Sequence, residues 1–378
     1  MMISKRLEPF GETVFATWSR LAVEHDAINL GQGFPDFQAP EFVKEAAIKA
    51  IRDGENQYSR SAGHPKLVEA VADTFEIPVE AMEEVTVTCG STETIAAVLL
   101  GLINPGDEVI IIEPFYDSYQ ACLSMAGANV NIVTLHAPDF TLDEEELRAA
   151  FTDQTKMIIL NSPHNPTGRV LHREELSLIA ALAIQHDTIV LSDEVYDKLV
   201  LTGEHIPIAT LPEMKDRTIT LRSLGKVFSV TGWKIGWAVA PKHLTNAIRQ
   251  AHQFLTFCAA TPLQVAAAEA LRAPDRYYTS YTNEYRQRRD LLVEGLRSVG
   301  FNVHTPEGTY FVLADHTPFG FGDDLAFCHH LVKEARVVGI PPTAFYAKST
   351  EGKGLVRFAF CKSLETLKNA VERLQVLA

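Results

Sequence analysis

The chain has 378 residues, of which 46% are hydrophobic, a formal net charge of −14 at pH 7 and five scattered cysteines. This length exceeds what one compact core usually holds, so we expect two domains, while the acidic balance argues against nucleic-acid binding as the main role. The cysteines lack metal-type spacing and no apolar run is long enough to cross a bilayer, so we expect no metal site, no membrane span and a cytoplasmic protein.

Strand-like runs alternate with helical stretches between residues 85 and 240. The β-branched residues of these runs and the intervening helices indicate an α/β fold with a largely parallel sheet covered on both faces. We predict seven strands in this part of the chain, at residues 85–87, 109–113, 131–135, 157–161, 188–193, 218–222 and 235–240.

The rest of the chain carries a second set of signals. Residues 262–297 contain few helix breakers apart from Pro274 and predict a helix that continues into a second region. That region has its own strand and helix signals, at residues 308–313, 325–335 and 355–360.

The first motif, at residues 88–94, follows a predicted strand and contains Gly90, Ser91 and Thr92. Small residues that open a helix leave backbone N–H groups free to bind an anion. Many helices begin in this way without binding a ligand, so the motif alone leaves both interpretations open.

Two further motifs follow apolar strands. Asn165 lies in a proline-containing turn after residues 157–160, and Asp193 and Tyr196 follow residues 189–192. In an open α/β sheet, ligands bind at the carboxyl ends of the strands. A carboxylate there could pair with a protonated pyridine nitrogen, and a phenol could hydrogen-bond a ring oxygen. The alternatives are an ordinary Asn-Pro turn and an aspartate that caps the next helix.

The fourth motif, at residues 223–236, contains Ser223, Lys226 and Lys234. A lysine that forms a Schiff base beside a phosphate needs this combination: an amine to hold an aldehyde carbon, and donors and a cation to hold the phosphate. Pyridoxal phosphate is a cofactor of this kind. The alternative is a solvated surface lysine next to a Gly-Trp pair that serves packing.

Together these motifs resemble the class I/II aminotransferases of the aspartate aminotransferase superfamily, which are pyridoxal-phosphate enzymes of fold type I. The resemblance spans residues 29–360. The stretches 31–37, 113–117 and 232–234 are most similar to the branch of kynurenine–oxoglutarate, glutamine–phenylpyruvate and methionine transaminases.

The resemblance implies two domains. The large, cofactor-binding domain would comprise residues 41–275, with a mostly parallel seven-stranded sheet between helices. The N-terminal residues 1–40 and the C-terminal residues 276–378 would together build a smaller α+β domain. No shift in composition marks these boundaries, so they rest on the resemblance.

The resemblance also assigns roles in the reaction. The catalytic residues would be Lys226, which holds the cofactor and moves a proton, Asp193, which keeps the pyridine nitrogen protonated, and Tyr196. Asn165 and Tyr196 would hydrogen-bond the ring oxygen. The other cofactor-binding residues would be Tyr116 and Val195 on the two ring faces, and Ser91, Thr92, Ser223 and Lys234 at the phosphate. Lys234 stands where many relatives carry arginine, so the phosphate contact should persist with a different geometry.

Tyr58 matches the tyrosine that relatives lend to the partner subunit's phosphate site, which implies a homodimer. Arg357 matches the arginine that grips the substrate's α-carboxylate, and a bidentate contact would both hold and orient that group. The other substrate-binding residues would be Gly33, through its backbone, together with Asn165, Phe15 and Phe257.

Substrate choice follows from the pocket that these aromatic residues would form with Phe34 and Tyr116. An apolar, aromatic-lined pocket favours aromatic amino acids, methionine, glutamine or kynurenine over aspartate as amino donor, with a 2-oxo acid as acceptor. A second arginine for a distal carboxylate has no motif-anchored candidate, and Arg60 is only a speculative one.

Two other functions remain open. A cysteine-conjugate β-lyase would use the same lysine, ring acid and phosphate site, so the motifs do not separate it from an aminotransferase. A non-enzymatic pyridoxal-phosphate-binding regulator normally carries a DNA-binding domain, and only about thirty residues precede Gly31, without a helix-turn-helix pattern.

Overall fold

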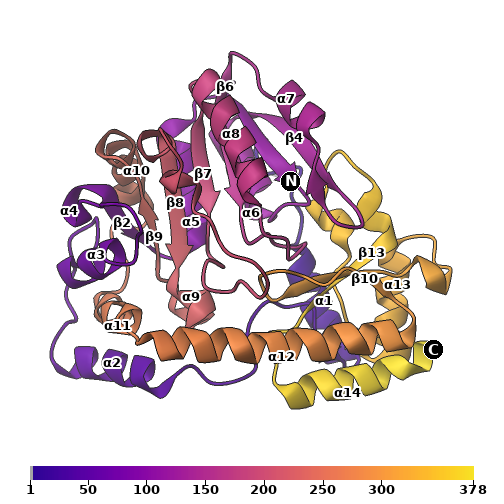
Figure 1. Cartoon of the computed structure of the whole chain (residues 1–378). Coiled ribbons are helices and arrows are strands. Elements are labelled where there is room, and N and C mark those ends of the chain that lie inside the picture. The colour runs from indigo at the N-terminus through magenta and orange to yellow at the C-terminus, as the bar shows by residue number, and fades with distance from the viewer. Residues whose placement is uncertain (1–2) are drawn as a thin grey trace.

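The structure, a computed structural model, describes residues 3–378. Its centre is an eight-stranded sheet in the order β2-β9-β8-β7-β6-β3-β4-β5 (Figure 1). Strands β8, β7, β6, β3 and β4 run parallel, whereas β9 is antiparallel to β2 and β8, and β5 is antiparallel to β4. The strands are β2 (Val85–Thr88), β3 (Glu108–Glu113), β4 (Asn129–His136), β5 (Thr141–Leu142), β6 (Thr155–Asn161), β7 (Ile189–Asp193), β8 (Thr218–Ser223) and β9 (Gly236–Val239).

Both faces of this sheet are buried, as the alternation along β3 illustrates. Val109 and Ile111 belong to one apolar cluster, and Ile110 and Ile112 belong to another. Successive side chains of a strand point to opposite faces, so an uninterrupted apolar run requires cover on both sides. One face carries α5 (Ser91–Leu102), α6 (Ser118–Ala126) and α10 (Lys242–Leu255), and the other carries α7 (Glu144–Ala150) and α8 (Arg173–Gln185).

The seven predicted strands are confirmed, and β5 is an addition. Two residues are too few to show an alternating pattern, which explains why the sequence does not reveal β5. The long helix predicted for residues 262–297 is two helices, α11 (Thr261–Leu271) and α12 (Asp275–Val299). The break falls at Pro274, whose ring removes a backbone donor and clashes with the preceding turn.

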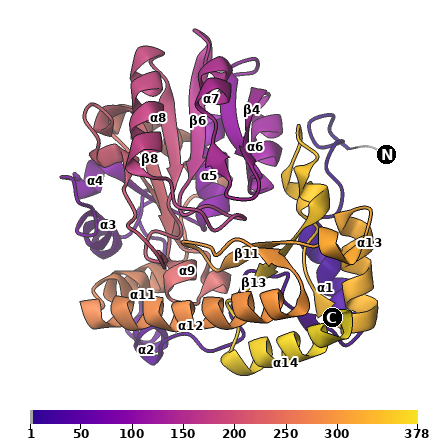
Figure 2. The ribbon, with the colours of Figure 1, turned by 45° about the vertical axis from the view of Figure 1, so that its right-hand side comes forward.

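A second, antiparallel sheet has the order β10-β11-β13. Its strands are β10 (Asn302–Val303), β11 (Phe311–Asp315) and β13 (Leu355–Ala359), and in β13 Arg357 lies opposite Leu313. Helix α14 (Leu364–Leu374) packs along α12, as both ribbon views show, and α13 (Asp324–His330) contacts β13 (Figures 1 and 2).

The N-terminal segment lies beside these C-terminal elements (Figure 2). Strand β1 (Ile28–Asn29) pairs in parallel with β12 (Val337–Val338), and α1 (Val14–Glu24) contacts β12. The domain boundaries after residues 40 and 275 stay a prediction. The remaining helices are α2 (Glu41–Arg52), α3 (Pro65–Ala72), α4 (Ala81–Glu84) and α9 (Leu224–Val227).

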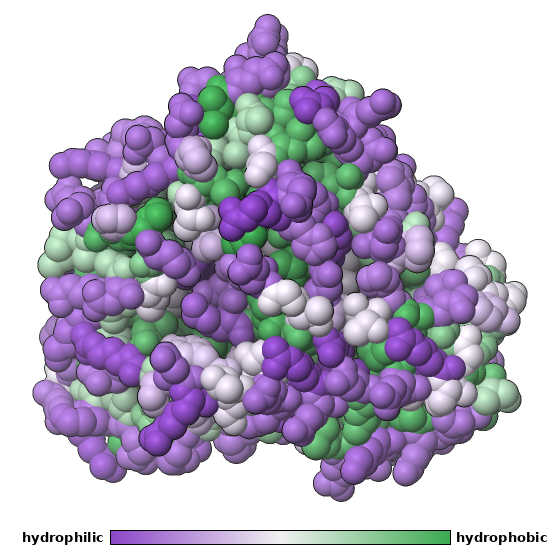
Figure 3. All heavy atoms as spheres, in the orientation of Figure 1, coloured by the Kyte–Doolittle hydropathy of each residue, from purple (hydrophilic) through white to green (hydrophobic). Residues whose placement is uncertain are grey.

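The face of the molecule in Figure 3 is mostly hydrophilic, with apolar patches between the charged side chains. Among residues 3–378, no helix has both the length and the apolar character that a membrane span requires. Two large aromatic side chains are nevertheless almost fully exposed, since Tyr58 keeps 84% and Phe254 keeps 87% of its surface accessible.

One buried carboxylate joins the large sheet to the segment before β13. Glu113, at the end of β3, is fully buried and accepts hydrogen bonds from the backbone N–H groups of Ala347, Lys348 and Ser349 and from the hydroxyl of Thr134. Four donors therefore converge on one buried side chain, and the buried hydroxyl of Thr134 would lose its acceptor if that side chain were removed.

We predict that Glu113→Ala lowers the free energy of unfolding by about 2–4 kcal/mol, because four hydrogen bonds to one buried carboxylate are lost together. Urea denaturation followed by circular dichroism measures the change. Glu145→Ala, on the exposed face of α7, is the matched control and should stay within about 0.5 kcal/mol of the wild type. Equal stability of the two variants would contradict the role assigned to Glu113.

Candidate active site

A pocket lies at the carboxyl ends of β6 and β7, where the helices α5, α6 and α9 begin. It has a volume of about 70 Å³ and is lined by Ser91, Tyr116, Tyr119, Asn161, Asn165, Asp193, Val195, Tyr196 and Lys226. Parallel strands that end at one edge of a sheet bring distant motifs together. The structure thus gathers residues from all four sequence motifs around one cavity.

Lys226 projects from the short helix α9 into this pocket and is surrounded by aromatic rings. Its Nζ donates to the hydroxyl of Tyr310 at 3.0 Å and lies 5.6 Å from the ring centroids of both Tyr196 and Tyr310. Burial lowers the pKa of the Lys226 amine to about 8, against the opposing influence of Cys361 and Asp193. A substantial fraction of the amine is therefore neutral, and hence nucleophilic, near physiological pH.

Asp193, the last residue of β7, is the buried acid of the pocket. Its Oδ2 accepts from the hydroxyl of Tyr119 at 2.6 Å, and its Oδ1 accepts from the backbone N–H of Val195 at 3.3 Å. Burial raises the pKa of the Asp193 carboxyl to about 6, and the bond from Tyr119 opposes that rise. A turn follows β7, so Asp193 caps no helix and remains directed at the pocket.

The N-terminus of α5 forms an open cradle opposite Lys234. Gly90 precedes the helix with φ at +82°, and within the described chain no side chain caps this helix. A Cβ at Gly90 would lie 3.2 Å from Nζ of Lys234, and a Cβ at Gly236 would lie 2.8 Å from the backbone nitrogen of Ser91. Glycine at both positions keeps free N–H groups and one cation around the same space, which suits an anion.

The neighbouring polar residues occupy compatible positions. Thr92 lies one residue into α5, and its hydroxyl is 3.5 Å from that of Tyr116. Ser223 ends β8 directly before α9, so it lies beside the helix that carries Lys226. Because β8 pairs with β9, Ser223 also lies opposite Gly236 at the cradle.

A buried ion pair fastens the strand ends behind this site. Glu194 directly follows Asp193 at the end of β7, and Arg222 directly precedes Ser223 in β8. The Nη2 atom of Arg222 lies 2.8 Å from the Oε2 atom of Glu194. Burial opposes ionisation of Glu194, but Arg222 and His205 hold the pKa of its carboxyl at about 2. The ion pair therefore links β7 to β8. Each of its two residues is the direct neighbour in sequence of a predicted cofactor-binding residue.

Arg357, on β13, is 1% exposed and closes the other end of the site. Its Nη1 donates to Oδ1 of Asn165 at 3.1 Å and its Nη2 donates to the carbonyl of Gly31 at 2.9 Å. The guanidinium carbon lies 4.2–5.1 Å from the ring centroids of Phe15, Phe311 and Phe345.

The charge of Arg357 is only partly satisfied by the protein. Burial lowers the pKa of the guanidinium to about 10, and its Nε has no hydrogen-bond partner within residues 3–378. In the same residues no carboxylate forms an ion pair with it. A buried cation that lacks an acidic partner is a suitable receptor for a ligand carboxylate.

Gly33 has a packing role in addition to the one predicted from sequence. A Cβ at this position would lie 2.7 Å from Cζ of Phe311 and 3.1 Å from Cε2 of Tyr310. A side chain at residue 33 would therefore displace two rings that line the site.

Tyr58 and Phe257 are not brought to the pocket within one chain. Their rings contact each other at 5.3 Å, and both are exposed on the surface. Phe34 is also exposed, over the ammonium of Lys362. The phosphate contact predicted for Tyr58 in a partner subunit and the substrate contact predicted for Phe257 both stay predictions.

Three residues of the site were missed by sequence reasoning. Tyr119 bonds to Asp193, Tyr310 bonds to Lys226, and Asn161 donates to the carbonyl of Asp193 while accepting from the backbone of Asn165. Asn161 ends a strand directly before the Asn165 turn, which is a signal that could have identified it. Tyr310 and Tyr119 lie in ordinary apolar surroundings and give no such signal.

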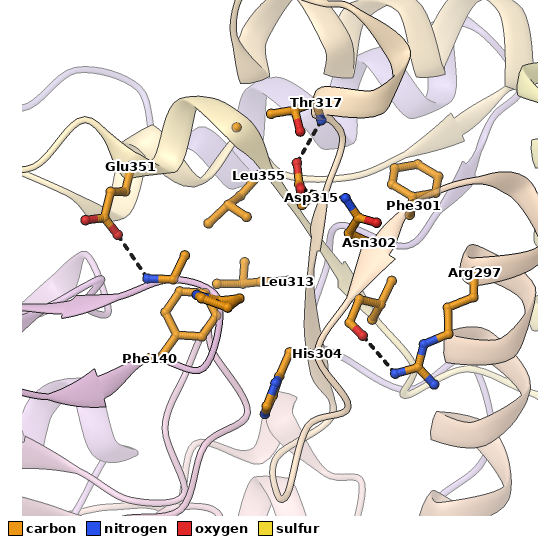
Figure 4. Close-up of a pocket in the computed structure, with 14 residues that line it drawn as sticks. Phe140, Arg297, Phe301, Asn302, His304, Leu313, Asp315, Thr317, Glu351 and Leu355 are labelled. Carbon is orange, nitrogen blue, oxygen red and sulfur yellow. Dashed lines mark hydrogen bonds between the residues drawn. The ribbon is translucent and has the colours of Figure 1, made fainter.

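A larger cavity, of about 750 Å³, lies between the β4–β5 connection and the second sheet (Figure 4). Phe140, Phe301, Leu313 and Leu355 form its apolar wall, and Glu351 bonds to the backbone of Ala137 at its edge. Among the residues that the structure describes, none predicted for the site lines it. The larger cavity is therefore not the candidate active site, because the buried amine, acid and cation lie around the smaller pocket.

The residues present fit a cofactor with an aldehyde, a basic ring nitrogen and a phosphate. Lys226 offers the amine, Asp193 the buried acid and the cradle beside Lys234 the anion site. No group of three or more His, Cys, Asp or Glu side chains arranged for a metal ion occurs in residues 3–378.

We predict that Tyr119→Phe raises the pKa of Asp193 above about 6, because the lost hydrogen bond favours the charged carboxylate. Only the ionised carboxylate pairs with a pyridinium, so affinity for pyridoxal phosphate should fall as pH falls through this pKa. The midpoint should move upward by roughly one pH unit in the variant. Absorption titrations from pH 5 to 9 measure it.

Tyr346→Phe is the control for this titration, because the buried Tyr346 hydroxyl has no hydrogen-bond partner in the described chain. The midpoint of Tyr346→Phe should equal that of the wild type. The ligand's own titration is the same in every sample, so it cancels when the midpoints of two variants are subtracted. An unchanged midpoint in Tyr119→Phe would refute the electrostatic role of Tyr119.

Comparison with known proteins matches almost the whole chain to one family. Residues 25–374 match the model for aminotransferase class I and II. The chain is 44% identical to the probable N-succinyldiaminopimelate aminotransferase DapC of Mycobacterium tuberculosis, covering 100% of this chain and 99% of the relative. It is 40% identical to a kynurenine–oxoglutarate transaminase of Dictyostelium discoideum, covering 98% and 95%.

A solved structure agrees with these matches. The N-succinyldiaminopimelate aminotransferase of Mycobacterium tuberculosis superimposes with a TM-score of 0.97 at 45% identity, over 100% of both chains. The agreement in fold, length and sequence leaves one conclusion. The chain belongs to the class I and II aminotransferases and has their fold type I architecture.

Proposed function

We propose that this aminotransferase uses pyridoxal phosphate and moves the α-amino group of an aromatic, methionine, glutamine or kynurenine-like amino acid to a 2-oxo acid by a ping-pong mechanism. The observation that carries the proposal is one pocket in which a buried amine at Lys226 faces a buried acid at Asp193, and to which Asn165 links Arg357, a cation without an ion pair among residues 3–378. Pyridoxal phosphate, when bound, supplies an electron sink that makes the α-proton of an amino acid removable.

The protein's own groups would divide the remaining work. Lys226, with its lowered pKa, would bond to the cofactor and later carry the proton. Asp193 would hold a proton on the ring nitrogen, and Arg357 would orient the substrate through its carboxylate. Asn165 accepts from Arg357 through Oδ1, so its amide N–H₂ is free to donate into the pocket that it lines.

The choice of donor rests on what surrounds Arg357. Phe15, Phe311 and Phe345 present rings to the guanidinium, and this setting favours an apolar side chain on the substrate. This apolar setting disfavours aspartate as donor.

A second candidate donor is N-succinyldiaminopimelate. The M. tuberculosis relative named for this activity is similar over the full length of the chain, and that match supports the candidate. A β-lyase acting on cysteine conjugates would use the same amine and acid. The match of residues 25–374 to the aminotransferase family supports an enzyme over a regulator without catalytic activity.

We predict that addition of single amino acids without a 2-oxo acid converts the absorption band of the lysine-bound cofactor into that of pyridoxamine phosphate. The rate of conversion ranks the donors, and the series should include N-succinyldiaminopimelate and aspartate. A retained band, with release of pyruvate from a β-substituted amino acid, would indicate the lyase. Aspartate as much the best donor would refute the proposed specificity.

Lys226→Ala should show no conversion with any donor, because the amine that transfers the proton is absent. Lys333→Ala, at an exposed position, is the matched control and should behave as the wild type. Turnover at the wild-type rate in Lys226→Ala would refute the mechanism.

We further propose that the enzyme is a homodimer in which Tyr58 serves the partner's phosphate site. The exposed pair of Tyr58 and Phe257 supports this, since large aromatic side chains clustered on a surface are typical of interfaces. A side chain that is exposed in one subunit could then complete the site of the other.

We predict that mixing Lys226→Ala and Tyr58→Ala subunits restores activity that neither variant has. A hybrid dimer would contain one site with both residues intact, giving about a quarter of wild-type turnover from a statistical mixture. The control mixes Lys226→Ala with Asp193→Asn, whose residues come from the same chain, and should restore none. Equal results for both mixtures would contradict a shared site.

A further inference from the structure

The hydroxyl of Tyr310 is the group in contact with the Lys226 amine, and its hydrogen is already committed. Tyr310 donates to the backbone carbonyl of Gly33 at 2.6 Å, while Lys226 Nζ lies 3.0 Å from the same hydroxyl oxygen. A phenol has one hydrogen to give. The Tyr310 oxygen must therefore accept from Lys226, so an N–H bond of the amine points along a fixed direction.

The position of this oxygen is set by packing. Tyr310 is fully buried, and its ring centroid lies 5.2 Å from that of Tyr196, 6.1 Å from that of Tyr285 and 4.8 Å from that of Phe311. Burial raises the pKa of the Tyr310 phenol well above its ordinary value, so the hydroxyl keeps its hydrogen at every physiological pH. A close-packed ring leaves the hydroxyl no alternative location.

Lys226 has few other constraints. Within residues 3–378 its Nζ makes no hydrogen bond besides the one to Tyr310, and no carboxylate forms an ion pair with it. A lysine side chain is long and flexible, so an otherwise unrestrained amine would sample many positions.

The same contact connects the amine to the segment that holds Arg357. Tyr310 bonds to the carbonyl of Gly33, and Arg357 bonds to the carbonyl of Gly31 two residues earlier. The backbone at residues 31–33 therefore fixes both the group that would move the proton and the group that would bind the substrate carboxylate.

We propose that Tyr310 is a positioning residue for Lys226, which holds the free amine so that its lone pair faces the α-carbon of the bound substrate. The inference rests on the proposed aminotransferase reaction. In the proton-transfer step, the C–H bond at the α-carbon would break, its electron pair would pass into the electron sink that pyridoxal phosphate supplies, and an N–H bond would form on Lys226, which would later give up that proton again. Tyr310 gives and takes no proton in either step.

The test replaces Tyr310 by phenylalanine, which removes one oxygen and keeps the ring in the stack. The control is Tyr285→Phe, since the Tyr285 hydroxyl is buried in the same stack and has no hydrogen-bond partner in the described chain. Both variants should unfold at temperatures close to that of the wild type, which verifies that the stack is intact.

The first measurement uses the cofactor-free protein. The pH dependence of acylation of Lys226, followed by mass spectrometry of the peptide, reports the pKa of the amine. An acceptor stabilises the charged ammonium, so Tyr310→Phe should move the midpoint below that of the wild type, by roughly one pH unit. Tyr285→Phe should leave the midpoint unchanged.

The second measurement uses the enzyme loaded with pyridoxal phosphate. In single turnovers with saturating amino donor, Tyr310→Phe should slow the reaction by about 10- to 100-fold, as expected for misplacement of a proton-transfer group. The dissociation constant of the donor should stay within about twofold, and α-deuterated donor should show a larger isotope effect than in the wild type.

The outcomes separate the two proposals. An unchanged acylation midpoint together with an unchanged isotope effect would overturn the role of Tyr310, and so would equal losses in Tyr310→Phe and Tyr285→Phe. If the wild type converts no amino donor, the aminotransferase proposal fails, whereas a shifted midpoint in Tyr310→Phe still supports the contact between Tyr310 and Lys226.

Discussion

The site depends on a chain of hydrogen bonds that crosses from the second sheet to the central one. Arg357 on β13 donates to Asn165, the backbone of Asn165 donates to Asn161, and Asn161 donates to the carbonyl of Asp193 on β7. Each member is buried, and a hydrogen bond in such a low-dielectric setting is electrostatically stronger than one in water. The position of the cation is thereby tied to that of the buried acid.

Burial supplies most of the chemical reactivity around this network. It lowers the pKa of Lys226 to about 8 and raises that of Asp193 to about 6, so an amine and an acid of ordinary type titrate close to neutrality. The protein stabilises these costly positions with compensating contacts nearby, such as the Tyr119 bond to Asp193 and the Glu194–Arg222 pair behind it.

The fold could be predicted from the sequence to a large extent, because its strands are uninterrupted apolar runs and its site residues directly follow them. The predicted residues that line the pocket with Lys226 and Asp193 were selected in this way. The sequence could not identify Tyr310 or Tyr119, since their function depends on contacts between residues 84 and 74 positions apart. Nor could it place Tyr58 and Phe257, because one chain does not bring them to the pocket.

The packing of Arg357 also couples the folding of this protein to its ligands. The guanidinium lies among three rings and its Nε meets no acceptor among residues 3–378, so the desolvation cost of this cation is only partly compensated by protein contacts. A carboxylate that enters the site would relieve this cost in the folded state and could not do so in the unfolded chain. Substrates and products would therefore act as stabilisers of the native state, in proportion to their concentration. The lifetime of the enzyme in a cell would then follow the supply of the amino acids and 2-oxo acids on which it acts.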